Sequence, residues 1–290
     1  MKKIAALYTC HNRKEKTLAS LQSLFEAKTP DVELHVFLTD DGCTDGTAAA
    51  ILEQFPDENI TIIQGDSNLF WAKGMIAAWK AAMKAAKDWN FYLLLNDDTI
   101  MLPNLFEELF ATHAYSLKNY GMPGIYSGIT CALDDPTKMT YGGDLWVDGD
   151  YAKSKRLKPT GEPQRCNMTN ANILLVDKNV VEKIGIFYPY EHGRADNDYA
   201  IHARKAGIPV LITGNFCGKC DCDHKTVAES RAYLQKLSLK QRKAYFKNPV
   251  HSSKDYITFV RRNMPGRLPM VLIGRMIDLY FPGLYGKLRG

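Results

Sequence analysis

The stretch LLLNDDT at residues 93–99 is an apolar run that ends on two adjacent carboxylates. A short apolar run bounded by polar residues predicts a buried strand, and open α/β sheets bind ligands at the carboxyl ends of their strands. Asp97 and Asp98 would therefore lie at the ligand-binding edge. Adjacent carboxylates repel each other and favour a divalent cation shared with substrate phosphates. Taken alone, capping of a helix near Pro103 by Asp98 or Thr99 explains the pair equally well.

The first hundred residues alternate strand-like and helix-like segments, which predicts an α/β fold with a mostly parallel sheet. We expect strands at residues 4–9, 34–38, 60–63 and 91–95, and helices at 14–25, 44–55 and 72–87. The pattern from 120 to 165 is less regular and rich in Gly, Pro, Asp and Tyr, with strand-like pieces at 128–133 and 139–141. A strand at 172–176, a helix at 178–184 and a strand at 209–213 follow.

The composition excludes several classes of protein. With 290 residues, 46% hydrophobic and 24% charged, the chain can bury a core and is not a disordered protein. It has no Gly-x-Gly-x-x-Gly after the first strand and no P-loop sequence, which disfavours dinucleotide oxidoreductases and P-loop enzymes. A haloacid-dehalogenase motif fails as well, because its nucleophile would fall on Thr39.

The amino terminus indicates the compartment. Residues 1–10 mimic a signal peptide, but polar residues follow at once and no small-residue cleavage site is present. The seven cysteines are odd in number, and five show no pattern that demands pairing. We therefore expect a cytoplasmic protein whose cysteines are mostly free thiols.

Charge is distributed unevenly along the chain. Residues 225–290 contain 14 Lys and Arg against three acids, a net charge of +11, which leaves −6 for residues 1–224. The segments 226–264 and 268–280 are predicted to be helical, and the second is amphipathic and basic. An anionic membrane on the inner face of the cell, packing on the sheet and a dimer interface are three explanations for this tail. It contains no recognisable nucleic-acid-binding module.

A second acidic cluster, DDGCTDGT at 40–47, follows the strand at 34–38. Gly42 allows a tight turn, and we expect Thr44 and Asp45 to cap the next helix. Asp40 and Asp41 remain at the ligand edge of the sheet, where one carboxylate can accept a hydrogen bond from a nucleotide base.

Several motifs together resemble the family 2 inverting glycosyltransferases of the GT-A fold. They are TCHNR at 9–13, DDGCTDGT at 40–47 and NDDT at 96–99. The segments NLFWAKGM at 68–75, YGG at 141–143 and ADNDY at 195–199 are similar to the rhamnosyltransferase-like branch. The resemblance covers residues 3–225 and implies a GT-A glycosyltransferase domain over 1–225, with a nucleotide-binding half (1–100), an acceptor and catalytic half (101–225), and a basic helical extension over 226–290.

The resemblance implies roles for the residues that would bind the donor. Asp41 matches the residue that recognises the donor's pyrimidine base, with Thr9 beside it. Asp97 matches the carboxylate near the ribose, and Asp98 matches the ligand of Mg²⁺ or Mn²⁺ on the diphosphate. Asn96 occupies the first position of this Asp-x-Asp-like motif.

Asp196 matches the catalytic base, with Asp198 as a helper, although Ala195 stands where a Glu is more usual. Inverting transfer needs a carboxylate that takes the acceptor hydroxyl's proton as its oxygen attacks the anomeric carbon. Without the other motifs, these acids would be read as ordinary residues of a first helical turn.

Other candidates have weaker signals. Lys73 lies next to Gly74 at a helix start and can face a diphosphate, whereas Trp71 is more typical of a core position. The remaining candidates are Asn68 for the donor, and Asn170, Asn172 and His192 for the sugar or acceptor pocket.

The cluster Cys217, Cys220, Cys222 and His224 has three explanations. The first is a zinc site, although these residues lie closer together in the sequence than the usual paired Cys-x-x-Cys and His elements. His224 instead matches a histidine that binds the donor's metal in many family members, and it can also be a plain surface residue.

We therefore expect a metal-dependent inverting glycosyltransferase that uses a dTDP- or UDP-linked sugar and a polysaccharide or lipid-linked saccharide acceptor. A non-catalytic nucleotide-sugar binding protein of the same fold and a nucleotidyltransferase are the alternatives.

Overall fold

The computed structural model describes residues 1–86, 88–147, 150–222 and 226–284. The chain forms two compact units: Met1–Pro189 with Ala195–Cys222, and Tyr190–Arg194 with Asp223–Gly290. The first unit ends close to the end of the expected glycosyltransferase domain. The second unit also includes Tyr190–Arg194. The sequence does not indicate this, because these residues lie within the stretch that otherwise forms the first unit.

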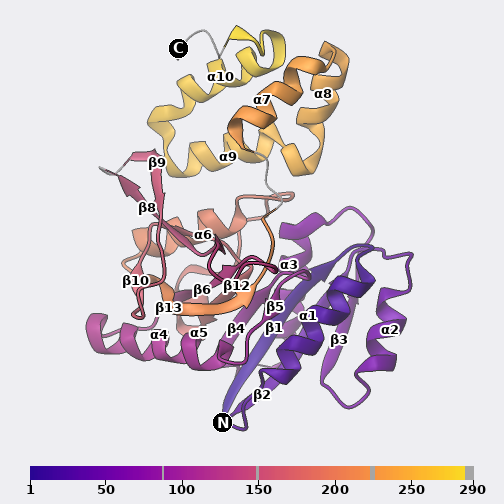
Figure 1. The fold of residues 1–290 in the computed structure, drawn as a ribbon, viewed down its shortest axis with the longest axis vertical. Coiled ribbons are helices and arrows are strands. Elements are labelled where there is room, and N and C mark those ends of the chain that lie inside the picture. Colours follow the sequence, from indigo (N-terminus) through magenta and orange to yellow (C-terminus); the bar gives the residue numbers. More distant parts are fainter. Residues whose placement is uncertain (87, 148–149, 223–225, 285–290) are drawn as a thin grey trace. The chain divides into compact units, whose positions relative to one another are not determined.

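The first unit is built on a mixed sheet with strand order β10-β13-β6-β12-β4-β1-β2-β3 (Figure 1). β1 (Lys2–Cys10), β2 (Val32–Asp40), β3 (Ile60–Gln64) and β4 (Phe91–Leu95) are parallel. β12 (Ile173–Asp177) runs antiparallel between β4 and β6 (Ile125–Cys131), and β13 (Val210–Lys219) is parallel to β6. The predicted α/β fold with a mostly parallel sheet at its amino-terminal half is confirmed.

Shorter strands complete this unit. β5 (Ile100–Met101) and β10 (Gln164–Arg165) pair with β13, and β7 (Met139–Tyr141) pairs with β6. A separate small sheet has the order β11-β8-β9, formed by Met168–Thr169, Gly143–Val147 and Asp150–Arg156.

Helices cover both faces of the large sheet because alternate strand residues point to opposite sides. Ile4, Ala6 and Tyr8 pack in one core cluster with residues of α1 (Lys14–Glu26), α2 (Thr47–Gln54) and α4 (Leu105–Tyr120). On the other face lies α3 (Phe70–Ala85), where a Cβ added to Gly74 would clash with Thr9 Oγ1. The glycine therefore permits the close approach of α3 to β1.

The remaining helices of this unit are α5 (Lys178–Ile184) and α6 (Ala195–Lys205). Tyr199 of α6 contributes to an aromatic cluster with Trp79, Tyr92 and Phe187. This cluster fixes α6, and hence its first turn, against α3 and β4.

The structure rules out the alternative of a cap at Asp98 or Thr99, and it corrects the expected cap at Thr44. α4 begins at Leu105 after the cap residue Asn104, and β5 intervenes, so neither Asp98 nor Thr99 caps it. The cap residue of α2 is Gly46 with φ 79°, not Thr44, although Asp45 does accept a hydrogen bond from the backbone N–H of Thr47 (3.1 Å). A tight glycine turn delays the helix by three residues.

The second unit contains α7 (Val227–Lys236), α8 (Leu239–Lys247), α9 (Ser253–Asn263) and α10 (Leu268–Tyr280), with 3₁₀ turns at Pro249–His251 and Pro265–Arg267. Capping boxes start α7 at Thr226 and α8 at Ser238. Asp255 of α9 accepts hydrogen bonds from the backbone N–H groups of Glu191 (2.9 Å) and His192 (3.1 Å), which attaches Tyr190–Arg194 to this unit. Among the described helices, we find none with the length and apolarity that crossing a bilayer requires.

Candidate active site

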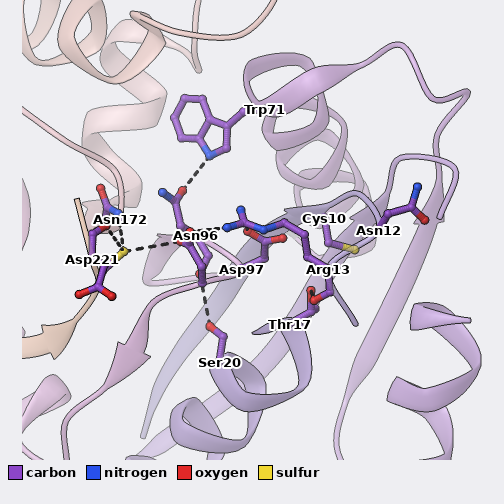
Figure 2. Close-up of polar contacts among 12 residues, drawn as sticks. Cys10, Asn12, Arg13, Thr17, Ser20, Trp71, Asn96, Asp97, Asn172 and Asp221 are labelled. Atoms are coloured by element: carbon purple, nitrogen blue, oxygen red, sulfur yellow. Dashed lines mark hydrogen bonds and ion pairs between the residues drawn. The ribbon is translucent and has the colours of Figure 1, made fainter. Parts of the chain in front are cut away.

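Two adjacent carboxylates at the carboxyl end of β4 share one guanidinium. Arg13, in the loop after β1, places Nη1 3.0 Å from Asp97 Oδ1 (Figure 2). Its Nη2 lies 2.6 Å from Asp98 Oδ2. β1 lies beside β4 in parallel register, so both loops leave the same edge of the sheet. The Asp97 side chain is buried, whereas Asp98 is one-fifth exposed and accessible to a ligand.

Burial perturbs the first of these acids. Desolvation raises the pKa of Asp97 to about 7, and the neighbouring charge of Asp98 raises it too, while Arg13 opposes the shift. One guanidinium therefore does not fully compensate two carboxylates in this position. The site favours additional positive charge.

Asn96, which directly precedes the two acids, is held in place by hydrogen bonds to three other segments. Its Oδ1 accepts a hydrogen bond from Trp71 Nε1 (2.8 Å), and its carbonyl accepts one from Ser20 Oγ (3.3 Å) (Figure 2). Its N–H donates to the carbonyl of Asn172 (3.2 Å). Asn96 therefore ties the end of β4 to α1, to α3 and to the segment before β12.

The segment 170–172 forms the side of the site opposite Arg13. Asn172 is buried and donates from Nδ2 to Cys220 Sγ (3.4 Å), and the Cys220 thiol lies 3.6 Å from Asp98 Oδ1. Burial, and then the charge of Asp98, raises the pKa of the Cys220 thiol to about 12, so it remains protonated. Among the described residues, the buried Oδ1 atom of Asn170 has no hydrogen-bond partner, and buried polar atoms of this kind usually have one.

Asp196 is held in the first turn of α6. Its Oδ1 accepts from the backbone N–H (2.8 Å) and the side-chain amide (3.2 Å) of Asn197, and its Oδ2 accepts from the N–H of Ala171 (3.3 Å). It is only partly buried. Because Ala171 directly precedes Asn172, one short segment connects Asp196 with the Asn96–Asp98 motif.

Asp41 lies at the amino terminus of α3. Its Oδ2 accepts from the backbone N–H groups of Phe70 (2.9 Å) and Leu69 (3.1 Å). Phe70 and Ser67 have positive φ angles of 55° and 67°, a strained conformation for side chains of this kind. The carboxylate thus stabilises an unusual turn beside the ligand-binding edge, a role that the sequence did not indicate.

The other expected donor residues lie on the same part of the first unit. Thr9 is buried beneath α3, and Lys73 is partly exposed in the first turn of that helix. Asn68 is exposed, and both its backbone and side-chain N–H groups donate to Asp66 (3.0 Å each). Asn68 therefore shapes the loop before α3.

The remaining three candidates, Asp198, His192 and His224, lie in different parts of the chain. Asp198 is buried in α6, two residues after Asp196. His192 belongs to the second unit, where its backbone N–H binds Asp255. His224 lies outside the described residues, so its proposed contact with a metal remains a prediction.

The expected cysteine cluster is divided among different surroundings. Cys217 is buried in β13 with its Sγ 4.0 Å from Thr213 Oγ1, Cys220 faces Asp98, and Cys222 is exposed. Within the described ranges, the group of His, Cys, Asp and Glu side chains close enough to share a metal is a different one, Cys10, Asp40 and Cys43.

The residues after β4 fit a divalent cation of the kind that the family resemblance implies. Asp98 is accessible, two acids share one guanidinium, and hard cations such as Mg²⁺ and Mn²⁺ bind through one or two carboxylates together with substrate phosphates. Asp98 would hold such an ion.

Sequence reasoning missed Arg13, and it placed Cys220 in a candidate metal cluster without its contact to Asp98. Arg13 stands within the motif at 9–13, but its role follows only from the pairing of β1 with β4. The available signal was a basic side chain shortly after one parallel strand, together with two acids shortly after another.

The carboxylates Asp41, Asp97 and Asp98 follow parallel strands of one sheet, at the edge where α/β sheets bind ligands. The chain belongs to glycosyl transferase family 2, whose model matches residues 7–161. That range contains Asp41, Asp97 and Asp98 but not Asp196.

Two solved structures share the fold. The mannosyltransferase PcManGT from Pyrobaculum calidifontis, in complex with GDP-Man and Mn²⁺, has a TM-score of 0.50 and 14% identity over 96% of this chain and 70% of its own. TarS from S. aureus has a TM-score of 0.57 and 12% identity, over 97% of this chain and 54% of its own, so this chain spans about half of that protein. The search of curated proteins found no match.

Proposed function

We propose that this protein is an inverting, divalent-metal-dependent glycosyltransferase of the rhamnosyltransferase-like branch. It would use a dTDP- or UDP-linked sugar and a polysaccharide or lipid-linked saccharide acceptor. The observation that carries the proposal is the short segment at Ala171 and Asn172, which joins the carboxylate of Asp196 to the Asn96–Asp98 motif. A candidate base and a candidate metal carboxylate that are tied to the same short segment are what displacement at an anomeric carbon needs.

In the proposed reaction, Asp196 accepts the proton of the acceptor hydroxyl as that oxygen forms a bond to the anomeric carbon of the donor. The bond between this carbon and the diphosphate oxygen breaks, and the nucleoside diphosphate leaves with the electron pair. The hydrogen bonds from Ala171 and Asn197 fix the orientation of the Asp196 carboxylate. The buried Oδ1 of Asn170, which has no partner within the described part of the chain, would accept a hydroxyl hydrogen of the sugar or acceptor.

A metal ion on Asp98 would neutralise the charge that develops on the leaving diphosphate. Asp41 and Thr9 would bind the base, Asp97 would lie near the ribose, and Lys73 would face the diphosphate. The Mn²⁺ and GDP-Man of the structural neighbour support a nucleotide-sugar donor with a divalent metal.

The decisive experiment separates binding from transfer in two variants. Nucleotide sugars are first screened by thermal shift with and without Mn²⁺, and the donor that binds is then tested for transfer. Asp98→Asn is expected to lose the metal-dependent shift, whereas Asp196→Asn keeps it and loses transfer by roughly 10²-fold or more. Asp57→Asn, which changes an exposed acid elsewhere on this unit, is the matched control.

Each alternative function has its own outcome in this experiment. Metal-dependent donor binding with neither transfer nor hydrolysis would establish a binding protein instead of an enzyme. Release of pyrophosphate from a nucleoside triphosphate would establish a nucleotidyltransferase. Full transfer activity in Asp98→Asn or Asp196→Asn would refute the assigned roles.

The second unit supports a proposal about the acceptor. α10 and the residues after it expose Met270 (69%), Ile273 (60%), Met276 (61%) and Phe281 (65%) in a chain segment with a net charge of +11. Apolar side chains combined with basic residues are typical of helices that lie on anionic bilayers, to which each basic residue contributes about 1 kcal/mol. We propose that this surface holds the enzyme on the inner face of the membrane, next to a lipid-linked acceptor.

A further inference from the structure

Three side chains that the proposed reaction does not use meet at the ends of two neighbouring strands. Cys10 is the last residue of β1 and Asp40 the last residue of β2, and the two are paired in register. Cys43 follows in the loop after β2. The ligand atoms of all three residues lie within 4.8 Å of one another. Cys10 and Asp40 are buried, while Cys43 is half-buried.

The spacing of the two thiols suits a shared metal ion. The Sγ atoms of Cys10 and Cys43 are 3.8 Å apart. Zinc binds thiolates at about 2.3 Å in a tetrahedral arrangement, which separates two sulfurs by about 3.8 Å. A disulfide would require them to close to about 2.05 Å.

The surrounding backbone already orients two of these groups. The N–H of Asn12 donates to Cys43 Sγ (3.2 Å), and the N–H of Cys43 donates to Asp40 Oδ1 (2.7 Å). Hydrogen bonds of this type fix metal ligands and stabilise their negative charge. The half-buried side of Cys43 leaves a route by which an ion and a water molecule can reach the group.

We propose that Cys10, Asp40 and Cys43 form a zinc site, with water as the fourth ligand. Two thiolates select a soft or borderline cation, whereas Mg²⁺ and Mn²⁺ prefer the oxygen ligands of the separate Asp98 site. The zinc site takes no part in the bond-making steps of the proposed sugar transfer, and its test does not require a known donor.

The site would brace the donor-binding loops. Arg13 follows Cys10 by three residues, and Asp41 directly follows Asp40. The links already present between these loops include the hydrogen bonds from Asp41 N to the carbonyl of Cys10 (3.0 Å) and from Thr44 N to Asn12 Oδ1 (2.7 Å). A bound zinc ion would add a stronger link at the same place and hold Arg13 and Asp41 in position.

The first test measures metal content in the full chain. After reconstitution with zinc and removal of excess metal, elemental analysis should give about one zinc per chain for the wild type. Cys10→Ser combined with Cys43→Ser should lose it. Cys166→Ser, which alters another buried thiol of the same unit, is the matched control and should retain it. Cobalt substitution should give sulfur-to-cobalt charge-transfer absorption in the wild type and control alone.

The second test uses the wild-type chain and so does not depend on the folding of a variant. Zinc should slow alkylation of Cys43 roughly tenfold or more, since only the metal-free fraction reacts. Mn²⁺ should not protect it. Cys222 is exposed and serves as the internal control, with equal reactivity in both conditions. Absence of zinc binding, protection of Cys222 instead of Cys43, or a Cys10–Cys43 disulfide that excludes zinc would each overturn the proposal.

Discussion

The Nη2 atom of Arg13 lies 2.6 Å from Oδ2 of Asp98, while Nη1 of the same guanidinium lies 3.0 Å from Asp97. Arg13 thus supplies positive charge to two adjacent acids. A metal ion at Asp98 would share this task, so Arg13 and the metal are expected to be energetically coupled.

Arg13→Gln is expected to destabilise the metal-free protein by about 1–2 kcal/mol, since a half-exposed guanidinium is lost from two acids, one of them buried. Mn²⁺ should restore more stability to this variant than to the wild type. Urea unfolding with EDTA or with Mn²⁺ measures both effects. The neighbouring Lys14→Gln, which removes an exposed pair with Glu15, is the control. An equal Mn²⁺ effect in all three proteins would argue against the coupling.

The raised pKa of Asp97 predicts that the free energy of unfolding depends on pH. Burial raises its folded-state pKa to about 7 from an ordinary value of 3.8. Between these values the folded state binds more protons than the unfolded state, so this group's contribution to stability falls as pH rises from about 4 to about 7 and is constant above. Asp97→Asn should remove this slope and raise the free energy of unfolding at pH 8 by up to a few kcal/mol.

Urea unfolding at several pH values, with EDTA present, measures this slope for wild type and variant. The difference between the two curves isolates Asp97 from the other titrating groups. A difference that is flat from pH 4 to pH 8 would mean that Asp97 is not perturbed by burial.

Asp41 has two separable roles, as a proposed ligand of the donor base and as the acceptor for the start of α3. Asp41→Ala should lower the free energy of unfolding by about 1–2 kcal/mol, because two backbone N–H groups lose their partner. Asp41→Asn keeps one acceptor oxygen and should cost less. Both variants should weaken donor binding, Asn by about tenfold, since a charge-assisted hydrogen bond becomes neutral.

Calorimetric titration of the donor, alongside urea unfolding, distinguishes the roles of Asp41. Wild-type donor affinity in Asp41→Asn would show that Asp41 serves α3 alone. Asp57→Asn again provides the baseline for an acid that contacts neither feature.

The exposed apolar residues of α10 predict binding to anionic lipid. The wild type should sediment with vesicles that contain phosphatidylglycerol and remain in solution with pure phosphatidylcholine, and added salt should weaken the binding. Ile273→Asp combined with Met276→Asp should reduce binding at least tenfold, because two apolar contacts become charged. Leu52→Asp, at an exposed apolar residue of α2, should have no effect.

If the exposed face of α10 contacts something other than anionic lipid, the same experiments would give different results. A wild-type protein that ignores anionic vesicles but forms a dimer disrupted by the α10 substitutions would indicate a self-association surface. Equal vesicle binding by the wild type and the α10 variant would place the lipid contact elsewhere.

Local pattern was enough to predict much of the fold. The strand at 91–95 and the helices at 178–184 and 268–280 have the expected bounds, because each combines a clear apolar period with sharp boundary residues. The helix predicted at 44–55 starts late, at Thr47, because Gly46 adopts a left-handed conformation that its neighbours do not specify. The order of β13, β6, β12 and β4 could not be predicted, since strand pairing over long separations depends on tertiary packing.

The sequence by itself determined that an apolar strand ends on Asp97 and Asp98, that a second acidic turn follows at Asp40 and Asp41, and that these motifs resemble family 2 glycosyltransferases. Only the tertiary structure decided which groups face these acids. Arg13 is 84 residues from Asp97 and Cys220 is 122 residues from Asp98, yet parallel pairing and the return of β13 bring them to one edge. Local propensity acts over a few residues, whereas the contacts that set charge and burial at this site are made by elements far apart in the chain.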